Sequence, residues 1–202
     1  MRVEVKWDKR AIAALATGPM KSAVRSALRK AGSTALRDMR SEGTKRVRAM
    51  KRIKPRYIRD AMSLRATGGA IKDMEWALNV SGKPVPLIAY PHKAVKGRAA
   101  TRSGRGKAGP RSPGGMIVEV NVGKQTFVRG AFVATMRSGH QGIFRRKGAA
   151  RLPIVELLGS RPVDALLHSG ESEAVAFRGY QSFAQTFTRV LPIEIGKAKG
   201  GE

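Results

Sequence analysis

The feature that most constrains the fold is a long stretch of helical period between Met20 and Met50. Apolar side chains recur there at intervals of three and four residues, the spacing of one face of an α-helix. The residues on this stripe are Val24, Leu28, Ala31, Ala35, Met39, Val47 and Met50. At 1.5 Å per residue, about 30 residues would span roughly 45 Å. The sequence therefore predicts one long amphipathic helix near the N-terminus.

The opposite face of this helix is basic. Its cations are Lys21, Arg25, Arg29, Lys30, Arg37, Arg40, Lys45, Arg46 and Arg48. Asp38 and Glu42 are the only acids between residues 20 and 50, so i,i+4 ion pairs add little to the helix. A charge run is usually a solvated face, but one so unbalanced favours a face that meets a partner. The candidate contacts to DNA or to a protein partner on this face are Arg25, Arg29 and Arg37.

The imbalance extends to the whole chain, which has 40 Lys and Arg against 14 Asp and Glu, a formal charge of +26. A field of that size repels itself, so the isolated protein should lose stability at low salt. It also predicts a polyanionic partner or a strongly acidic protein neighbour.

Length and composition set further bounds. The chain has 202 residues, which fits a single domain spanning residues 1–202. It has no cysteine, which excludes disulfides, cysteine-based zinc sites and thiol catalysis. No apolar run approaches the length of a membrane span, and the first residues lack the apolar core of a signal peptide. We therefore expect no membrane contact, and use in the cytosol or in a particle assembled there.

Several shorter elements follow from local periodicity. Arg2–Trp7 alternates like a strand, and Asp8 can cap a short helix through Leu15. A second short helix is expected from Pro55 to about Leu64. Two strands, Ala70–Val80 and Pro84–Tyr90, then read as a hairpin.

Residues 91–114 form a low-complexity stretch rich in Lys, Arg, Gly and Pro, with no acid. It has too few large apolar residues to order itself by burial, so we expect a flexible basic loop. A linker between hairpins is the simpler interpretation, but the single sign of charge favours contact with a partner. The candidate contact residues in it are Arg98, Arg102, Arg105, Lys107 and Arg111.

Short apolar runs separated by glycine-containing turns dominate the next part of the chain. Met116–Val122 alternates like a strand. Phe127–Leu158 then reads as a three-stranded meander, with runs at Phe127–Met136, Ile143-Phe144 and Leu152–Leu158. Its polar positions are mostly cationic, so the sheet should show a basic face or rim.

Two helices close the chain. A short one is expected from Pro162 to Leu167, and a longer one after a cap at Ser169. Its apolar stripe is expected to be Ala176, Tyr180, Phe183, Phe187 and Val190, ending at Leu191-Pro192, and residues 196–202 should form a frayed tail. The predicted fold class is α+β. The long N-terminal helix and the C-terminal helix pack on a mostly antiparallel sheet of five or six strands.

The sequence contains no constellation that predicts catalysis, a metal or a cofactor. His92, His140 and His168 are isolated and lack metal-ligand spacing. No nucleotide-binding or nucleophile-elbow motif is present. A small basic ribonuclease using His140, Arg145 and Arg146 is conceivable in principle. A turn followed by arginines is far more often a binding surface, so we expect no enzyme.

The meander carries a resemblance. Its residues read F-x-A-x-M-x-S-G-H-x-G-I-F-x-R from Phe132 to Arg146, followed by R-L-P-I-x-E-L from Arg151 to Leu157. This dense run of about 30 residues resembles the minor tail protein Z family of lambda-like long-tailed phages, also described as tail-completion proteins. Gly159-Ser160-Arg161-Pro162 departs from the family's G-P-S-V-P by moving the proline.

The resemblance implies a structural protein of the virion neck, assembled in the host cytoplasm, that completes the head-proximal end of the tail. It implies a ring, commonly of six copies, that contacts the tail terminator, the head-tail connector and possibly the DNA end. The expected docking element consists of Ser138, Gly139, His140, Gly142, Phe144, Arg145 and Arg146. The competing hypothesis is a stand-alone basic nucleic-acid-binding protein.

Overall fold

The computed structural model describes residues 1–16, 18, 20–97, 114–168 and 170–199. Contacts divide the chain into two compact units, each built from separate stretches of sequence. Unit 1 comprises Met1–Val47, Ile58–Gly82 and Pro162–Glu202, and unit 2 comprises Arg48–Tyr57 and Lys83–Arg161. The expectation that residues 1–202 act as one domain stays a prediction.

Unit 1 combines a small sheet with two long helices. Its strands are β1 (Arg2–Glu4), β2 (Met62–Thr67) and β3 (Glu75–Val80), and its helices are α1 (Lys9–Leu15), α2 (Met20–Met50), α4 (Pro162–Leu166) and α5 (Glu171–Lys199). The last three residues of α2 belong to unit 2, and α3 (Pro55–Asp60) crosses the boundary between the units. A short 3-10 helix, η1 (Ile71–Asp73), precedes β3. The antiparallel sheet has the order β1-β3-β2.

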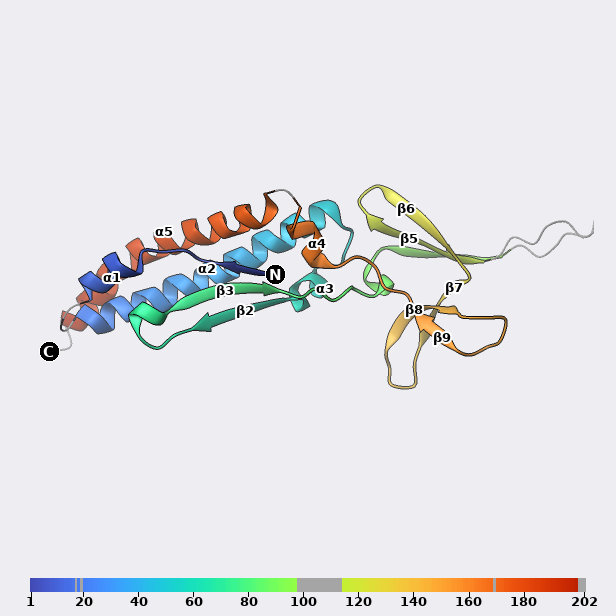
Figure 1. The fold of residues 1–202 in the computed structure, drawn as a ribbon, viewed down its shortest axis with the longest axis horizontal. Coiled ribbons are helices and arrows are strands. Elements are labelled where there is room, and N and C mark those ends of the chain that lie inside the picture. The colour runs from blue at the N-terminus through green and yellow to red at the C-terminus, as the bar shows by residue number, and fades with distance from the viewer. Residues whose placement is uncertain (17, 19, 98–113, 169, 200–202) are drawn as a thin grey trace, which may run out of the picture. The chain divides into compact units, whose positions relative to one another are not determined.

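The two long helices of unit 1 run side by side in opposite directions (Figure 1). Arg46 of α2 meets Glu171 at the start of α5, and Lys30 meets Glu194 near its end. Gly179 of α5 lies directly against Met39 in the middle of α2. Because Gly179 has no side chain, the two helices can approach each other closely at their midpoint.

The same helices cover one face of the sheet. A Cβ atom at Gly32 would overlap the indole ring of Trp76 in β3, and one at Gly43 would lie 3.2 Å from the Met62 side chain of β2. Trp76 also contacts Trp7 and Phe183, with ring centroids 5.9 Å and 5.5 Å apart. The core of unit 1 is therefore an aromatic cluster that joins the segment after β1, β3 and α5.

Three predictions for the N-terminal region are confirmed. α2 has the predicted bounds, and its predicted apolar stripe from Val24 to Val47 is buried. α1 begins after Asp8, whose carboxylate accepts hydrogen bonds of 3.0 Å from the amides of Arg10 and Ala11. β1 forms at the start of the segment that was expected to be a strand.

The region between residues 55 and 90 differs from its prediction. The helix α3 ends at Asp60 rather than near Leu64, and Met62–Thr67 forms strand β2. The expected hairpin between residues 70–80 and 84–90 is wrong, since β3 pairs with β1 and β2. Residues 85–90 are instead a mostly buried segment with a 3-10 helix, η2 (Leu87–Ala89).

α5 also departs from its prediction. It continues through Pro192 to Lys199, so the expected stop at Leu191-Pro192 is wrong, and the frayed tail expected at 196–202 stays a prediction. Residue 169 and residues 200–202 lie outside the described residues. Within the expected stripe Phe183 is buried, but Tyr180 is 50% exposed. The buried face is instead formed by residues 175, 179, 182, 183 and 186.

Unit 2 consists mainly of two three-stranded antiparallel sheets. One has the order β4 (His92–Val95), β5 (Gly115–Asn121), β6 (Lys124–Arg129), and the other β7 (Ala131–Thr135), β8 (Gln141–Arg146), β9 (Ile154–Glu156). The α+β class is confirmed, but a single sheet of five or six strands is wrong. The described residues hold nine strands in three sheets.

The predicted meander is found as β7-β8-β9, but its first run is divided. Gly130, with φ at +69°, separates β6 from β7, so Phe127 belongs to the other sheet, where it pairs with Ile117. The expected strand over residues 116–122 is confirmed as β5. The segment expected to be a basic loop begins with β4, and residues 98–113 lie outside the described part of the chain.

Tyr90 anchors the segment that follows β9. Its side chain is fully buried, and its hydroxyl donates a 3.1 Å hydrogen bond to the carbonyl oxygen of Ser160. Burial raises the pKa of this phenol. A Cβ atom at Gly159 would lie 2.5 Å from the Tyr90 ring, so this position requires glycine. The departure from the family pattern thus begins after a glycine that the packing of unit 2 fixes.

Candidate interaction surfaces

The residues that carry the sequence resemblance share one face of the β7-β8-β9 sheet. In the strand register Phe132 faces Phe144, Ala134 faces Gly142, and Phe144 faces Glu156. Side chains two residues apart on a strand point to the same side. The alternate positions of the motif therefore form one continuous surface.

A histidine-carboxylate pair closes the turn end of this surface. Nε2 of His140 lies 2.9 Å from Oε1 of Glu156, and the His140 ring meets the Phe144 ring edge to face at 6.4 Å. A Cβ atom at Gly142 would lie 2.6 Å from the same Glu156 oxygen. Gly142 therefore leaves the space in which the Glu156 carboxylate reaches His140.

The turn itself is exposed. Gly139 has φ at +81°, a conformation that favours glycine, and its amide donates to the carbonyl oxygen of Met136 at 2.9 Å. Ser138, Gly139 and His140 are all exposed. These residues of the expected docking element are thus available to a partner.

The arginines of the expected docking element lie at the other end of β8. Arg145 and Arg146 are its last two residues, and both are exposed. The five steps between the six residues of β8, at about 3.3 Å each, place Arg146 roughly 17 Å from the start of the strand. His140 and the two arginines of the expected docking element thus lie toward opposite ends of β8, and the docking role of these residues stays a prediction.

This separation bears on the ribonuclease hypothesis. That mechanism needs His140 close to Arg145 and Arg146, so that an acid and phosphate clamps act on one substrate group. In the structure His140 instead contacts Glu156 and Phe144. The three residues are not brought together as that mechanism requires.

The arginine end of β8 has two neighbours that sequence reasoning missed. The Arg146 guanidinium lies 5.5 Å from the centroid of the Phe132 ring, on the same face. Arg129, at the end of β6, lines a surface hollow together with Phe132, Arg145 and Arg146. The strand register would have placed Phe132 beside Arg146, but only the bend at Gly130 brings in Arg129.

The basic face of α2 forms the second surface. Arg25, Arg29 and Arg37 are exposed, as expected of partner contacts. A groove along the first half of the helix is lined by Gly18, Lys21, Ser22, Arg25, Ser26, Arg29 and Lys30. Cations at 21, 25 and 29 recur every four residues, about 6 Å along the axis. The groove therefore presents an extended row of positive charge.

Glu194 of α5 borders this row. Lys30 Nζ donates to its Oε1 at 2.8 Å and Ser26 Oγ donates to its Oε2 at 2.6 Å. These hydrogen bonds, the Lys30 bond first, lower the pKa of Glu194 to about 2. Its charge neutralises Lys30 and leaves Lys21, Arg25 and Arg29 for a partner.

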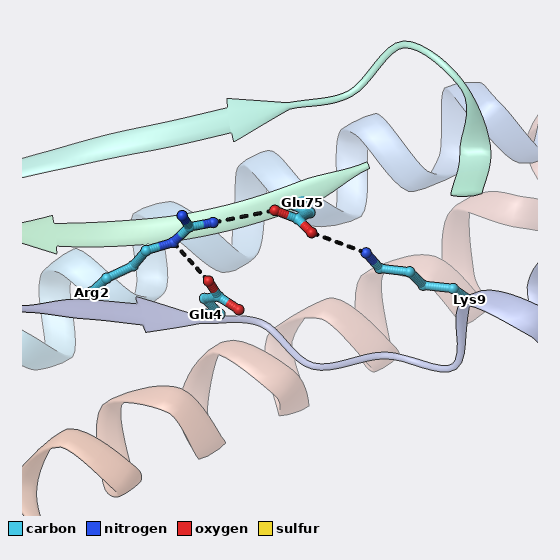
Figure 2. A network of polar contacts seen from close by, with 4 residues as sticks. All are labelled: Arg2, Glu4, Lys9 and Glu75. Carbon is cyan, nitrogen blue, oxygen red and sulfur yellow. Dashed lines mark hydrogen bonds and ion pairs between the residues drawn. The ribbon is translucent and has the colours of Figure 1, made fainter. Parts of the chain in front are cut away.

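On the other side of unit 1, the open face of the sheet is neutralised internally. Figure 2 shows Glu75 of β3 between Arg2 and Lys9, with Glu4 beside Arg2. The hydrogen bond from Lys9 is the main cause of the lowered pKa of Glu75. Here acids and bases are matched, in contrast to the groove on α2.

The outer side of α5 is a third kind of surface. Phe177 and Tyr180 are 61% and 50% exposed. Between Glu173 and Glu194 the helix has only two charged residues, Arg178 and Arg189. Arg178 lies 3.9 Å from Asp38 of α2. This stretch is a largely uncharged, partly aromatic helix face in a very basic protein.

Three further expectations concern the basic loop, metal sites and membrane spans. The loop candidates Arg98, Arg102, Arg105, Lys107 and Arg111 lie outside the described residues. Within the described ranges, no three His, Asp or Glu side chains gather as a metal site would require. None of the helices in those ranges is both long and apolar enough to cross a membrane.

Comparison with known proteins gives one match. A family model described as prophage minor tail protein Z (GPZ) matches residues 5–178. No curated protein and no solved structure matches the chain. The matched residues include most of both units, well beyond the 30-residue motif.

Proposed function

The chain belongs to the prophage minor tail protein Z family, and from that premise we propose that it is a structural protein of the phage neck. The family is one of phage minor tail proteins, which is consistent with a structural role in the virion tail and with a non-enzyme. In our proposal the protein completes the head-proximal end of the tail and helps to join tail to head. The family match over residues 5–178 is the observation that carries this proposal.

The proposal includes a ring of copies, commonly six, around the DNA channel. Its neighbours are the tail terminator, the head-tail connector and the end of the DNA. The charge supports this arrangement, because several copies at +26 each would repel one another without nearby polyanions or acidic surfaces. The row of cations on α2 is the described surface best suited to such a polyanion.

Contact between copies requires a surface without excess positive charge. The outer side of α5 around Phe177 and Tyr180 meets that requirement. Sedimentation velocity at about physiological ionic strength, with its Debye length of about 8 Å, should therefore show oligomers that Phe177→Ser with Tyr180→Ser weakens. An unchanged oligomer would assign the contact to another surface, and a monomer in assembled particles would contradict the ring.

The neck role is tested by removing the gene from a phage or prophage that carries it. We expect heads and tails to form but few particles to be infectious, with infectivity restored by the gene supplied in trans. In micrographs, density for the protein should disappear from the head-proximal end of the tail. Normal infectivity and an unchanged neck would contradict the proposal.

A second candidate is a stand-alone nucleic-acid-binding protein, favoured by the groove on α2. The variant Arg25→Gln, Arg29→Gln, Arg37→Gln should then weaken duplex binding. The slope of log K against log salt concentration should become less steep by about 0.9 for each phosphate that the variant no longer neutralises. The matched control removes three other exposed cations of unit 1: Arg10, Arg65 and Lys72. If both variants weaken duplex binding equally, the binding reflects only non-specific attraction of the duplex to net positive charge.

A further inference from the structure

The hollow at the arginine end of β8 has a composition unlike the rest of unit 2. It has a volume of about 540 Å³ and opens to solvent where β6 turns into β7. Its lining consists of Arg129, Gly130, Phe132, Arg145, Arg146, Gly148 and Ala149. Three cations, one aromatic ring and small residues thus surround a space that no acidic side chain lines.

The three guanidinium groups are not neutralised within the described residues. No Asp or Glu in the described ranges lies within 4.0 Å of Arg129, Arg145 or Arg146. In contrast, the paired acids of unit 2, Glu119 and Glu156, contact Arg52 and His140. The cations around the hollow are therefore available to an external anion.

An aromatic ring in the lining of the hollow lies against one of these groups. The Arg146 guanidinium lies over the Phe132 ring at 5.5 Å. A cation over an aromatic ring is attracted to the ring face, and the N–H groups of a guanidinium match a carboxylate or a phosphate in two parallel hydrogen bonds. Gly130 and Gly148 have no side chains, and at neither would a Cβ atom meet anything within 4 Å. Both glycine positions in the lining thus border open space.

We propose that this hollow is an anion site that takes carboxylates from an acidic segment of a partner protein. Three arginines line one compact hollow, which suits one or two carboxylates of a short peptide. A nucleic-acid backbone is bound instead by contacts to successive phosphates along an extended line. The row of cations on α2 has that linear form, whereas this hollow does not. The lining of the hollow indicates the chemistry of a partner, and this inference does not depend on ring formation or on position in the neck.

The test uses a fluorescent peptide of alternating Glu and Gly and the full-length chain, with affinity measured by anisotropy. The site variant is Arg129→Gln, Arg145→Gln, Arg146→Gln. The matched control removes three other exposed cations of unit 2: Lys93, Lys124 and Arg137. We expect the affinity to fall about tenfold in the site variant and less than about threefold in the control, because only the site variant removes charge-assisted bidentate bonds.

Two further variants keep the test decisive. The triple lysine variant is Arg129→Lys, Arg145→Lys, Arg146→Lys. It retains the charge but removes the planar guanidinium groups, and should still weaken binding by about threefold. Phe132→Leu should weaken binding, whereas Phe127→Leu, at an exposed ring on β6, should not. If the glutamine variant fails to fold, by circular dichroism, the lysine variant decides in its place.

Defined outcomes would overturn the proposal. Equal effects of the site and control variants would show attraction to net charge alone. A single-stranded oligonucleotide of the same charge serves as the competing ligand. If its binding falls in the site variant while peptide binding does not, the hollow is a nucleic-acid site and the proposal is wrong.

Discussion

Single glycines determine how closely the parts of unit 1 pack. At Gly32 the Trp76 indole occupies the place of a side chain, and at Gly179 the Met39 side chain does so. Both are helix positions, where glycine is unfavourable relative to alanine by about 1 kcal/mol. That cost is offset by the contact of the aromatic cluster and of α5 with α2.

The first prediction concerns Gly32→Ala. The added methyl group would overlap the rigid Trp76 ring, and overpacking of a core typically costs about 1–3 kcal/mol. Urea unfolding should show a decrease of that size in the free energy of unfolding. The control is Gly196→Ala in α5, which meets nothing within 4 Å and should be neutral or stabilising by up to about 1 kcal/mol. Equal stability of both variants would contradict the tight contact at Gly32.

The second prediction concerns Glu194 and pH. Because its pKa is lowered to about 2 in the folded protein, its ionised form stabilises the fold above the unfolded pKa of about 4.3. That stabilisation is lost as pH falls from the unfolded value through the folded one. Glu194→Gln should therefore melt at a lower temperature than the wild type at neutral pH. The difference should shrink between about pH 4.5 and pH 2.

The control for Glu194 is Glu173→Gln, an exposed acid on the same helix. It removes the same charge without the hydrogen bonds from Lys30 and Ser26. We expect its melting temperature to stay close to that of the wild type at each pH. A constant difference between Glu194→Gln and the wild type from neutral pH to pH 2 would contradict the assignment.

At the scale of elements, two of the ion pairs that link α2 to α5 differ in distance and exposure. Arg46 Nη1 lies 2.6 Å from Glu171 and its Nε 2.7 Å from Glu42, all three partly buried. These contacts, the Glu171 bond first, raise the pKa of Arg46. Arg178 and Asp38 are more exposed and lie 3.9 Å apart. The pairs provide an internal comparison of strong and weak helix links.

The third prediction is a double-mutant cycle on each pair. Arg46→Met with Glu171→Gln should show a coupling energy of about 1 kcal/mol, because the pair is partly shielded and well aligned. Arg178→Met with Asp38→Asn should show less than about 0.3 kcal/mol. The readout is the free energy of unfolding in urea. A larger coupling for the second pair would contradict the geometry.

The sequence predicts best the elements whose period is long and regular. α2 has 31 residues and a continuous stripe, so no local alternative competes. Around Met62 the pattern is ambiguous, because Tyr57, Ile58, Ala61 and Met62 fit a helix while Met62 and Leu64 fit a strand. Tertiary pairing with β3 decides for the strand. Pro192 suggests a helix end, because proline has no N–H to donate to the preceding turn, yet α5 continues through it to Lys199.

Strand partners are beyond the reach of local reasoning. Alternation identifies a strand and its two faces but carries no information on which strand pairs with it. For this reason the sequence suggests the wrong neighbour for β3 and merges three small sheets into one. In the candidate sites, the positions of His140, Arg145 and Arg146 on one strand follow from the motif. Their separation follows from the length of β8, whereas the inclusion of Arg129 beside the arginine end depends on the turn at Gly130.

At the scale of the whole molecule, the charge should set the response to salt. The chain has 40 Lys and Arg against 14 Asp and Glu, so cations outnumber acids almost three to one. The fourth prediction is that the melting temperature of the dilute protein rises from about 0.02 M to about 0.3 M NaCl, as the Debye length shortens and repulsion is screened. The measurement is differential scanning fluorimetry. A melting temperature that falls over this range would show that ion pairs, rather than repulsion, dominate.

The path of the chain through unit 1 has a consequence for synthesis on the ribosome. Trp76 and its cluster partner Phe183 are 107 residues apart, with most of unit 2 between them. At about 5–20 residues per second, α2 and the sheet would wait roughly 5–20 s for the helix that completes their core. A nascent chain released early would leave that apolar face exposed and would be susceptible to proteolysis. The core of unit 1 therefore cannot be complete until translation has passed Phe183 in α5.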